Sequence, residues 1–202
     1  SRHEDLGAVF FEAGGWERPQ WYESNSSLLE EFGDAVMDRT NEWDSRWWSP
    51  IINAEHLALR KRAGLIDLSS FVILDISGPA ALDAVQRVAL AQMDVAIGRV
   101  VYTPVLDEAG GFRSDLTIMR LAHDRFRVVT GAAHGMVDRK WFSDRLPETG
   151  AHIADLTSAY TSVGLWGPRA RDILSQVTTA DISHEGFAFG TCTTIQVGSL
   201  EV

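Results

Sequence analysis

Residues 99–130, RVVYTPVLDEAGGFRSDLTIMRLAHDRFRVVT, carry the strongest fold signal in this chain. Within it, the β-forming segments 99–106 and 112–121 are separated by the turn sequence DEAGG, which predicts a β-hairpin. A second turn follows at 122–125, and residues 126–130 predict a third strand. Strands joined by tight turns pair antiparallel, so this stretch predicts an antiparallel sheet.

Helical patterns flank this sheet. Helices are expected over 54–63, 80–90 and 134–146, and a further strand over 72–76. Gly64 is expected to end the first helix. Pro79 stands where the first turn of the second helix tolerates proline, and Pro147 helps to end the third. Helices combined with hairpins predict an α+β fold, with helices packed on antiparallel sheets.

The segment around Gly78 recurs 89 residues later. Residues 74–83, LDISGPAALD, resemble residues 163–172, VGLWGPRARD. The identical pairs are Gly78/Gly167, Pro79/Pro168, Ala81/Ala170, Asp83/Asp172 and Val88/Val177. A strand that ends in Gly-Pro and enters a helix therefore occurs twice, which predicts an internal pseudo-repeat. Chance recurrence of a common strand-to-helix turn is the alternative.

The composition excludes several classes of protein. A length of 202 residues suits one domain with an attached segment, or two small domains. The 28 acidic and 18 basic side chains give a net charge of −10, so neither nucleic acid nor an anionic membrane surface is an expected partner. The single cysteine, Cys192, excludes an intrachain disulfide. No apolar run could cross a bilayer and no signal-peptide profile is present, so a cytoplasmic location is expected.

Residues 1–50 differ in composition from the rest. They hold 11 acidic and 4 basic side chains, and five of the seven tryptophans: Trp16, Trp21, Trp43, Trp47 and Trp48. Exposed indole is costly unless it finds a partner. We therefore expect a connecting arm that packs against residues 51–202 or against a further domain, and through which chains self-associate. A disordered linker is the alternative, because Gly14-Gly15 and the serines of 24–27 favour it.

Familiar cofactor and metal motifs are absent from the sequence. It contains no G-x-G-x-x-G, no Walker loop, no H-E-x-x-H and no G-x-S-x-G. No metal-ligand spacing links its six histidines, His3, His56, His123, His134, His152 and His184. We therefore expect neither a dinucleotide site nor a metal site on this chain.

Asp115 is the most informative residue of the hairpin. Strand alternation places Asp115 and Thr117 on one face of the sheet and Leu116 and Ile118 on the other. Aspartate is uncommon inside strands, so its presence needs a reason. Either Asp115 is solvated near the turn or bonds to the backbone there, or the strand aims its carboxylate into a pocket as a base or hydrogen-bond acceptor. The spacing fits both interpretations.

Several segments together resemble the glycine-cleavage T-protein (aminomethyltransferase) family. They are Tyr102-Thr103, 107–111, 115–117, 126–131, the run RAGLIDLS at 62–69 and the SGP turn at 77–79. A second set resembles the C-terminal half of dimethylglycine and sarcosine dehydrogenases. This set comprises GAVF at 7–10, GWERP at 15–19, WSPI at 48–51, AEHL at 54–57 and LWGPRAR at 165–171. The match covers nearly the whole chain with its motifs in order, so the chain is identified as a member of this family.

The resemblance implies ferredoxin-like units in an α+β folate-binding domain, with tetrahydrofolate in a central cavity. It implies that Asp115 is the essential aspartate and faces folate N10, where a carboxylate can accept the proton of the reacting amine. Thr117, Tyr102, Val129 and Gly131 match pocket-wall positions, and Gly131 allows close approach of the ring. For Tyr102 and Val129, ordinary packing in the sheet is an equal alternative.

The resemblance also implies the function of a demethylating enzyme. A flavin-bearing half that carries FAD oxidises a dimethylglycine- or sarcosine-type amine to an iminium. The folate half captures the one-carbon unit as 5,10-methylenetetrahydrofolate, so the expected partners are folate, the iminium and the flavin domain of the parent. One alternative is a stand-alone aminomethyltransferase or folate-dependent demethylase, against which the tryptophan-rich arm argues. The other is a non-catalytic interaction module of the same fold.

The sequence departs from the family pattern in its extent. The family's flavin domain, its C-terminal barrel and its Y-x-G-E-x-G-W-E segment, whose glutamate holds the pterin, have no counterpart in residues 1–202. We therefore expect residues 51–202 to be a folate-binding domain truncated at its C-terminal side. Such a fragment should be inactive alone and bind folate weakly. The parent is expected in the cytoplasm, or in the mitochondrial matrix if it is eukaryotic.

Overall fold

The computed structural model describes residues 1–37 and 47–202. They form two compact units, of which the first comprises Ser1–Asp67 and Val163–Gln176 and the second Leu68–Ser162 and Val177–Val202. The chain thus leaves the first unit after Asp67 and returns to it at Val163. The division predicted at residue 50, between an arm and a folate-binding domain, stays a prediction. Trp43 of that arm lies outside the described residues.

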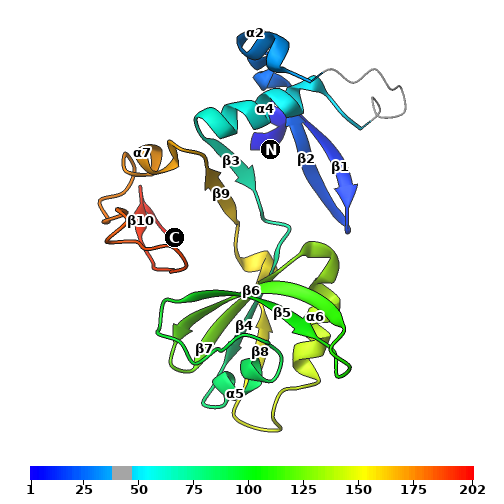
Figure 1. Ribbon diagram of the computed structural model, residues 1–202, viewed down its shortest axis with the longest axis vertical. Coiled ribbons are helices and arrows are strands. Elements are labelled where there is room, and N and C mark those ends of the chain that lie inside the picture. The colour runs from blue at the N-terminus through cyan, green and yellow to red at the C-terminus, as the bar shows by residue number, and fades with distance from the viewer. Residues whose placement is uncertain (38–46) are drawn as a thin grey trace. The chain divides into compact units, whose positions relative to one another are not determined.

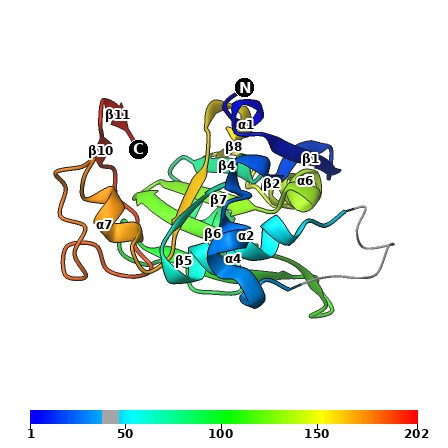
Figure 2. The same cartoon turned by 90° about the horizontal axis from the view of Figure 1, so that it is seen from above.

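The second unit is built on a five-stranded antiparallel sheet (Figure 1). Its strands, in spatial order, are β5 (Val100–Leu106), β6 (Phe112–Ala122), β7 (Arg125–Thr130), β4 (Val72–Ser77) and β8 (His152–Asp155). The first three follow one another along the chain through tight turns, as the alternating pattern predicts. Figure 2 shows β6 and β7 side by side within this sheet.

One face of this sheet packs against helices α5 (Ala81–Gln86) and α6 (Gly135–Ser143). Alternate residues of the strands point to this face and are buried, among them Ile118 of β6 and Phe126 of β7. They form one cluster with Val85 of α5 and Phe142 of α6. Burial of each such side chain stabilises the fold by about 1.5–3 kcal/mol. The intervening residues point to the opposite face, which we call the open face.

The remaining elements of the second unit are short. They are η3 (Ala132–His134), η4 (Thr157–Ala159) and the strand pair β10 (Gln196–Val197) and β11 (Leu200–Glu201). The segment between Thr178 and Ile195 is held to the sheet by an isolated bridge between Arg99 and Thr191 and by a hydrogen bond from the Cys192 N–H to the Gly98 carbonyl.

Within residues 1–37, 47–67 and 163–176, the first unit contains two two-stranded antiparallel sheets. In one, β1 (Ala8–Ala13) pairs with β2 (Trp16–Tyr22); in the other, β3 (Gly64–Asp67) pairs with β9 (Val163–Trp166). Its helices are α1 (Arg2–Asp5), η1 (Glu23–Asn25), α2 (Leu28–Phe32), η2 (Gly33–Ala35), α4 (Pro50–Lys61) and α7 (Ala170–Leu174). The hairpin β1–β2 turns at Gly14 and Gly15, whose φ values of 64° and 81° suit a tight hairpin turn. These glycines therefore belong to a hairpin, not to a linker.

The two Gly-Pro turns share one backbone conformation. Gly78 and Gly167 have φ values of 119° and 106°, a region that side chains with a Cβ rarely adopt. In each turn the residue three positions on donates its N–H to the glycine carbonyl. The first turn leads from β4 into α5 in the second unit, and the other leads from β9 into α7 in the first. The predicted strand–turn–helix repeat is therefore confirmed.

The predicted α+β class is confirmed, while the helix boundaries shift. The helix expected over 54–63 begins at Pro50, because the Ser49 hydroxyl caps it by accepting the Ile51 N–H at 3.2 Å. Gly64 opens β3 and does not cap the helix. The helix expected over 80–90 ends at Gln86, and α6 ends at Ser143. In the described part of the chain, no helix is long and apolar enough to cross a membrane.

The early end of α5 has a local cause. The Gln86 side-chain amide donates to the Ala91 carbonyl at 3.0 Å, and its oxygen accepts the Met93 N–H at 2.8 Å. One side chain thus supplies partners for the backbone that follows, so the chain turns back toward β5 instead of continuing the helix.

Candidate functional site

The open face of the second unit carries four of the five predicted site residues. On β6, Asp115 and Thr117 point to this face, while Ser114 and Leu116 are buried on the other. Aspartate is tolerated here because the strand alternation exposes it. The predicted alternation along this strand is therefore confirmed, and it places the carboxylate on a rigid part of the sheet.

Tyr102, Thr117 and Val129 form a row across three neighbouring strands. In the sheet register Tyr102 of β5 pairs with Thr117 of β6, and Thr117 pairs with Val129 of β7. Adjacent strands lie about 4.8 Å apart, so the row is about 10 Å long. Tyr102 is 67% exposed, whereas Thr117 and Val129 are partly buried. The row is thus a narrow surface with an aromatic ring at one end.

Tyr102 and Asp115 contact each other directly. Asp115 pairs with Pro104, which places it diagonally across from Tyr102, within reach of a long side chain. The Tyr102 hydroxyl donates a hydrogen bond to the Asp115 carboxylate oxygen Oδ2. This hydrogen bond, followed by desolvation and by the carboxylate's negative charge, raises the pKa of Tyr102. The tyrosine therefore stays a hydrogen-bond donor well above neutral pH.

Gly131 lies at the end of β7, where it precedes η3. Its φ of −64° is open to any residue, so the backbone does not require glycine here. The nearest atom to an added Cβ would be His134 Cδ2, at 4.0 Å. The space beside Gly131 is therefore open, which is compatible with the predicted close approach of a ligand ring.

A buried carboxylate anchors the sheet behind the site. Asp138 of α6 is 4% exposed and accepts hydrogen bonds from the hydroxyls of Ser114, at 2.9 Å, and of Thr130. Ser114 precedes Asp115, and Thr130 lies between Val129 and Gly131 in the sequence. Asp138 therefore fixes the two strand segments that carry the predicted site residues. No local sequence pattern marks Asp138 as part of the site.

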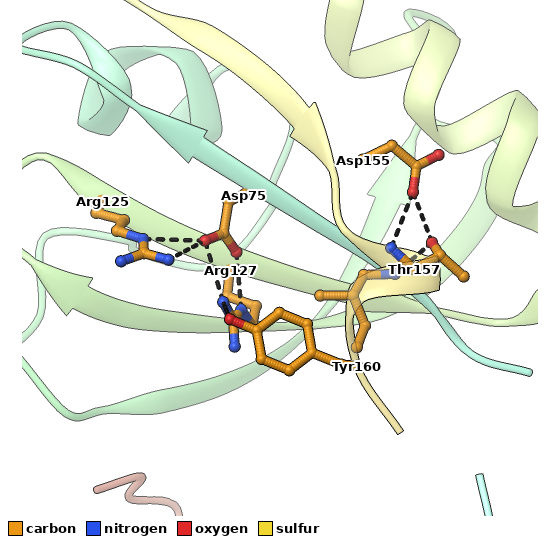
Figure 3. A network of polar contacts seen from close by, with 7 residues as sticks. Asp75, Arg125, Arg127, Asp155, Thr157 and Tyr160 are labelled. Carbon is orange, nitrogen blue, oxygen red and sulfur yellow. Dashed lines mark hydrogen bonds and ion pairs between the residues drawn. The ribbon is translucent and has the colours of Figure 1, made fainter. Parts of the chain in front are cut away.

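A second polar group on the open face was also missed. Asp75 of β4 is almost fully buried between Arg125 and Arg127 of β7 (Figure 3). Arg127 Nε donates to Asp75 Oδ1 at 2.7 Å, and Arg125 Nε donates to Oδ2 at 2.9 Å. Tyr160 covers the Arg127 guanidinium, whose carbon lies 4.4 Å from the ring centroid. The alternation of charged and apolar residues in RFRVV was the available signal for this face.

The two arginines control the charge state of Asp75. Burial alone would raise the pKa of Asp75. The hydrogen bonds from Arg127 and Arg125, together with their positive charges, outweigh burial and lower it. Asp75 is therefore an ionised, buried carboxylate at neutral pH.

The first unit contains a cavity of about 800 Å³. Residues of β2, α4 and β3 line it, and no predicted site residue does. Glu55 accepts hydrogen bonds there from the Tyr22 N–H at 3.0 Å and the Asn25 side chain at 2.7 Å, and burial raises the pKa of Glu55. The cavity combines acidic and basic side chains, so its lining does not define one class of ligand.

Together the fold and the open face define a class of protein. It is an α+β domain that presents a hydrogen-bonded carboxylate beside an exposed aromatic ring on a rigid antiparallel sheet. Among the residues that the structure describes, no cluster of three or more His, Cys, Asp or Glu side chains could hold a metal ion. The model of the GCVT N-terminal domain matches residues 1–202, and the chain belongs to this family.

Comparisons with individual proteins agree with this assignment. The chain is 34% identical over 185 residues to 4-methylaminobutanoate oxidase (formaldehyde-forming) of Paenarthrobacter nicotinovorans, a match that covers 92% of this chain and 22% of that protein. It is 29% identical over 201 residues to the mitochondrial pyruvate dehydrogenase phosphatase regulatory subunit of Mus musculus, covering 98% of this chain and 22% of that protein.

A solved structure extends the likeness to the fold. The glycine cleavage system aminomethyltransferase T from Bartonella henselae superposes with a TM-score of 0.72 at 25% identity. The superposition covers 94% of this chain and 44% of that one. The chain thus spans 22% of the curated relatives named above and less than half of this structural neighbour.

Proposed function

We propose that this chain is the tetrahydrofolate-binding portion of an enzyme that demethylates a small N-methyl amine of the dimethylglycine or sarcosine type. The observation that carries the proposal is the Tyr102–Asp115 pair on the open face of a GCVT-type domain. The similarity to an oxidase named for a methylamino substrate and for formaldehyde formation supports it. When bound, tetrahydrofolate supplies the nitrogens that take up the one-carbon unit, giving 5,10-methylenetetrahydrofolate.

The residues of the open face suit a flat, aromatic cofactor. The row of Tyr102, Thr117 and Val129 would lie along one side of the ring system, and the open space at Gly131 leaves room at its end. Small or apolar side chains against a ring, with few polar groups to fix its orientation, are typical of cofactor sites. The aminobenzoyl amine would face Asp115.

Asp115 would act on a proton. A carboxylate beside an amine nitrogen stabilises positive charge on that nitrogen and accepts its proton as a new bond forms. Oδ2 accepts the Tyr102 hydrogen bond, so Oδ1 can receive the proton. Tyr102 holds the carboxylate in one orientation, since both groups lie on paired strands.

The rest of the proposed enzyme lies outside this chain. We expect FAD on a separate domain of the parent, which would supply the iminium. The tryptophan-rich arm over 1–50 is the proposed docking segment, and Trp47 is 54% exposed. Self-association through this arm is a further part of the proposal. A monomeric mass in light scattering would contradict it.

A blocking variant tests the location of the site. Thr117→Trp fills the middle of the row, so tetrahydrofolate binding by the full-length protein should weaken at least tenfold in a calorimetric titration. Thr179→Trp, an exposed position of the same unit outside the open face, is the matched control and should bind normally. Unchanged binding by Thr117→Trp would place the cofactor elsewhere and overturn the proposal.

Two other functions have specific support. The similarity to a regulatory subunit favours a non-catalytic interaction module, which would keep the fold but not depend on Asp115 for any reaction. The likeness to an aminomethyltransferase favours a stand-alone enzyme of that kind. An upstream G-x-G-x-x-G in the same reading frame would favour the flavin-linked enzyme over the stand-alone one.

A further inference from the structure

The open face of the sheet carries opposite charges at its two ends. Asp115 lies toward one end of β6, and the Arg125–Asp75–Arg127 group lies on β7 and β4 toward the other. Two guanidinium groups share a single carboxylate, so this group has a net charge of about +1 at neutral pH. A ligand that lies along the face would thus meet a carboxylate at one end and a positive group at the other.

The sheet register gives the separation of the two ends. Arg127 pairs with Met119, which is four residues beyond Asp115 on β6. At about 3.3 Å per residue, Arg127 stands about 13 Å along the strand direction from Asp115. Val129 lies between these ends on the same face of β7. Val129 and Arg127 are alternate residues of β7, so the predicted pocket wall and the positive group lie next to each other along this strand.

One arginine is enough to pair with both oxygens of the Asp75 carboxylate. Arg127 alone contacts both of its oxygens, with Nε 2.7 Å from Oδ1 and Nη2 3.1 Å from Oδ2. Arg127 is also held by the Tyr160 hydroxyl, which accepts from Nη2 at 3.0 Å. Arg125 therefore adds a positive charge that Asp75 does not require for pairing. The Arg125 side chain is 46% exposed, whereas the Arg127 side chain is 17% exposed. The arrangement presents a fixed but accessible guanidinium, a form well suited to binding carboxylates.

We propose that Arg125 and Arg127 form an anion-binding subsite for the glutamate carboxylates of tetrahydrofolate, with Asp75 and Tyr160 as positioning residues. This inference rests on the proposed function, because it assumes that the aminobenzoyl amine lies at Asp115. From that amine, the benzoyl ring and the glutamate extend over a distance comparable to the 13 Å separation. The carboxylate of an N-methyl amino acid is only two bonds from its own nitrogen, so it cannot reach the arginines while its amine lies at Asp115.

The test removes the charge from the protein and the glutamate from the ligand. Arg125→Gln leaves Asp75 paired with Arg127, so the variant should fold, which circular dichroism checks. Lys140→Gln removes an exposed charge of α6 in the same unit and is the control. Binding of tetrahydrofolate and of tetrahydropteroate, which lacks the glutamate, is measured by calorimetry on the full-length protein.

The expected pattern is specific to the glutamate. Wild type should bind tetrahydrofolate more tightly than tetrahydropteroate. Arg125→Gln should lose about tenfold for tetrahydrofolate and nothing for tetrahydropteroate, while Lys140→Gln changes neither. Equal losses for both ligands, or no loss, would overturn the subsite and leave the proposed function standing. Failure of wild type to bind either ligand would overturn both.

Discussion

The Tyr102 hydroxyl donates a hydrogen bond to the Asp115 carboxylate across strands β5 and β6 of the second unit. Both side chains are exposed on the open face, so neither is needed to fill the core. An exposed, paired carboxylate on a rigid strand is a feature of sites more than of packing.

Removal of the tyrosine hydroxyl should affect the reaction and not the fold. Tyr102→Phe keeps the ring and removes the donor to Asp115. Without this donor the Asp115 carboxylate is no longer held in one orientation, so the proposed formation of methylenetetrahydrofolate should slow by about tenfold. The midpoint of urea unfolding should stay unchanged, because Tyr102 is exposed. A variant with the wild-type rate would show that this hydrogen bond has no part in the reaction.

The ionisation of Tyr102 should depend on Asp115. The carboxylate raises the pKa of Tyr102 above the ordinary value of about 10. In Asp115→Asn the negative charge is gone, so the pKa of Tyr102 should fall back toward that value. Tyrosinate absorbance, recorded as the difference between each protein and its Tyr102→Phe counterpart, isolates this residue from Tyr22 and Tyr160. Identical titrations with and without Asp115 would contradict the hydrogen bond.

Asp138 should contribute strongly to stability. Asp138→Ala leaves the buried hydroxyls of Ser114 and Thr130 without their acceptor, which should lower the free energy of unfolding by about 2–4 kcal/mol. Asp144→Ala removes an exposed partner of Lys140 just beyond the same helix and should cost less than about 1 kcal/mol. Chemical denaturation of both variants measures the difference. Equal costs would show that Asp138 is not an anchor of the two strands.

Acid should weaken the second unit through Asp75. The pKa of Asp75 is lower in the folded state than in the unfolded chain, so its ion pairs stabilise the fold above about pH 4. That stability is lost as the pH falls through the lowered pKa. Asp75→Asn should therefore be less stable than wild type at pH 7, and the gap should narrow below about pH 4. A gap that stays constant with pH would rule out this linkage.

The two Gly-Pro turns should be equally intolerant of a side chain. A Cβ at Gly78 would lie 2.4 Å from the Gly150 carbonyl oxygen, and one at Gly167 would lie 2.5 Å from the Leu59 carbonyl oxygen. Alanine at either position should cost several kcal/mol. Gly110 also has a positive φ but nothing within 4 Å of its Cβ, so Gly110→Ala should cost only about 1–2 kcal/mol. Thermal unfolding of the three variants compares these costs.

Most strands and turns of the second unit could be predicted from local sequence patterns. The alternation around Asp115 predicted both the strand and the face that its side chain takes, because one side of β6 must bury apolar residues. The repeated Gly-Pro turn was visible because only glycine suits its φ. The resemblance to the T-protein family, and not the spacing, supplied the proposed roles of Thr117, Val129 and Gly131.

Other features depended on contacts that the sequence does not encode locally. Asp75 and Arg127 are 52 residues apart and meet only because β4 pairs with β7. Asp138 and Ser114 likewise meet only after α6 packs on the sheet. The hairpin β1–β2 was missed because its tryptophans and acidic residues masked the alternation, although Gly14-Gly15 marked its turn.

Tetrahydrofolate binding by the full-length protein, measured by calorimetry with Asp115→Asn beside wild type, tests whether the open face is a folate site. We predict that wild type binds and accelerates formation of methylenetetrahydrofolate from formaldehyde, and that Asp115→Asn binds within a few-fold of wild type but does not accelerate it. Absence of binding by wild type, or an Asp115→Asn variant that reacts as fast as wild type, would contradict the assignment of the open face as a folate site with Asp115 at its centre.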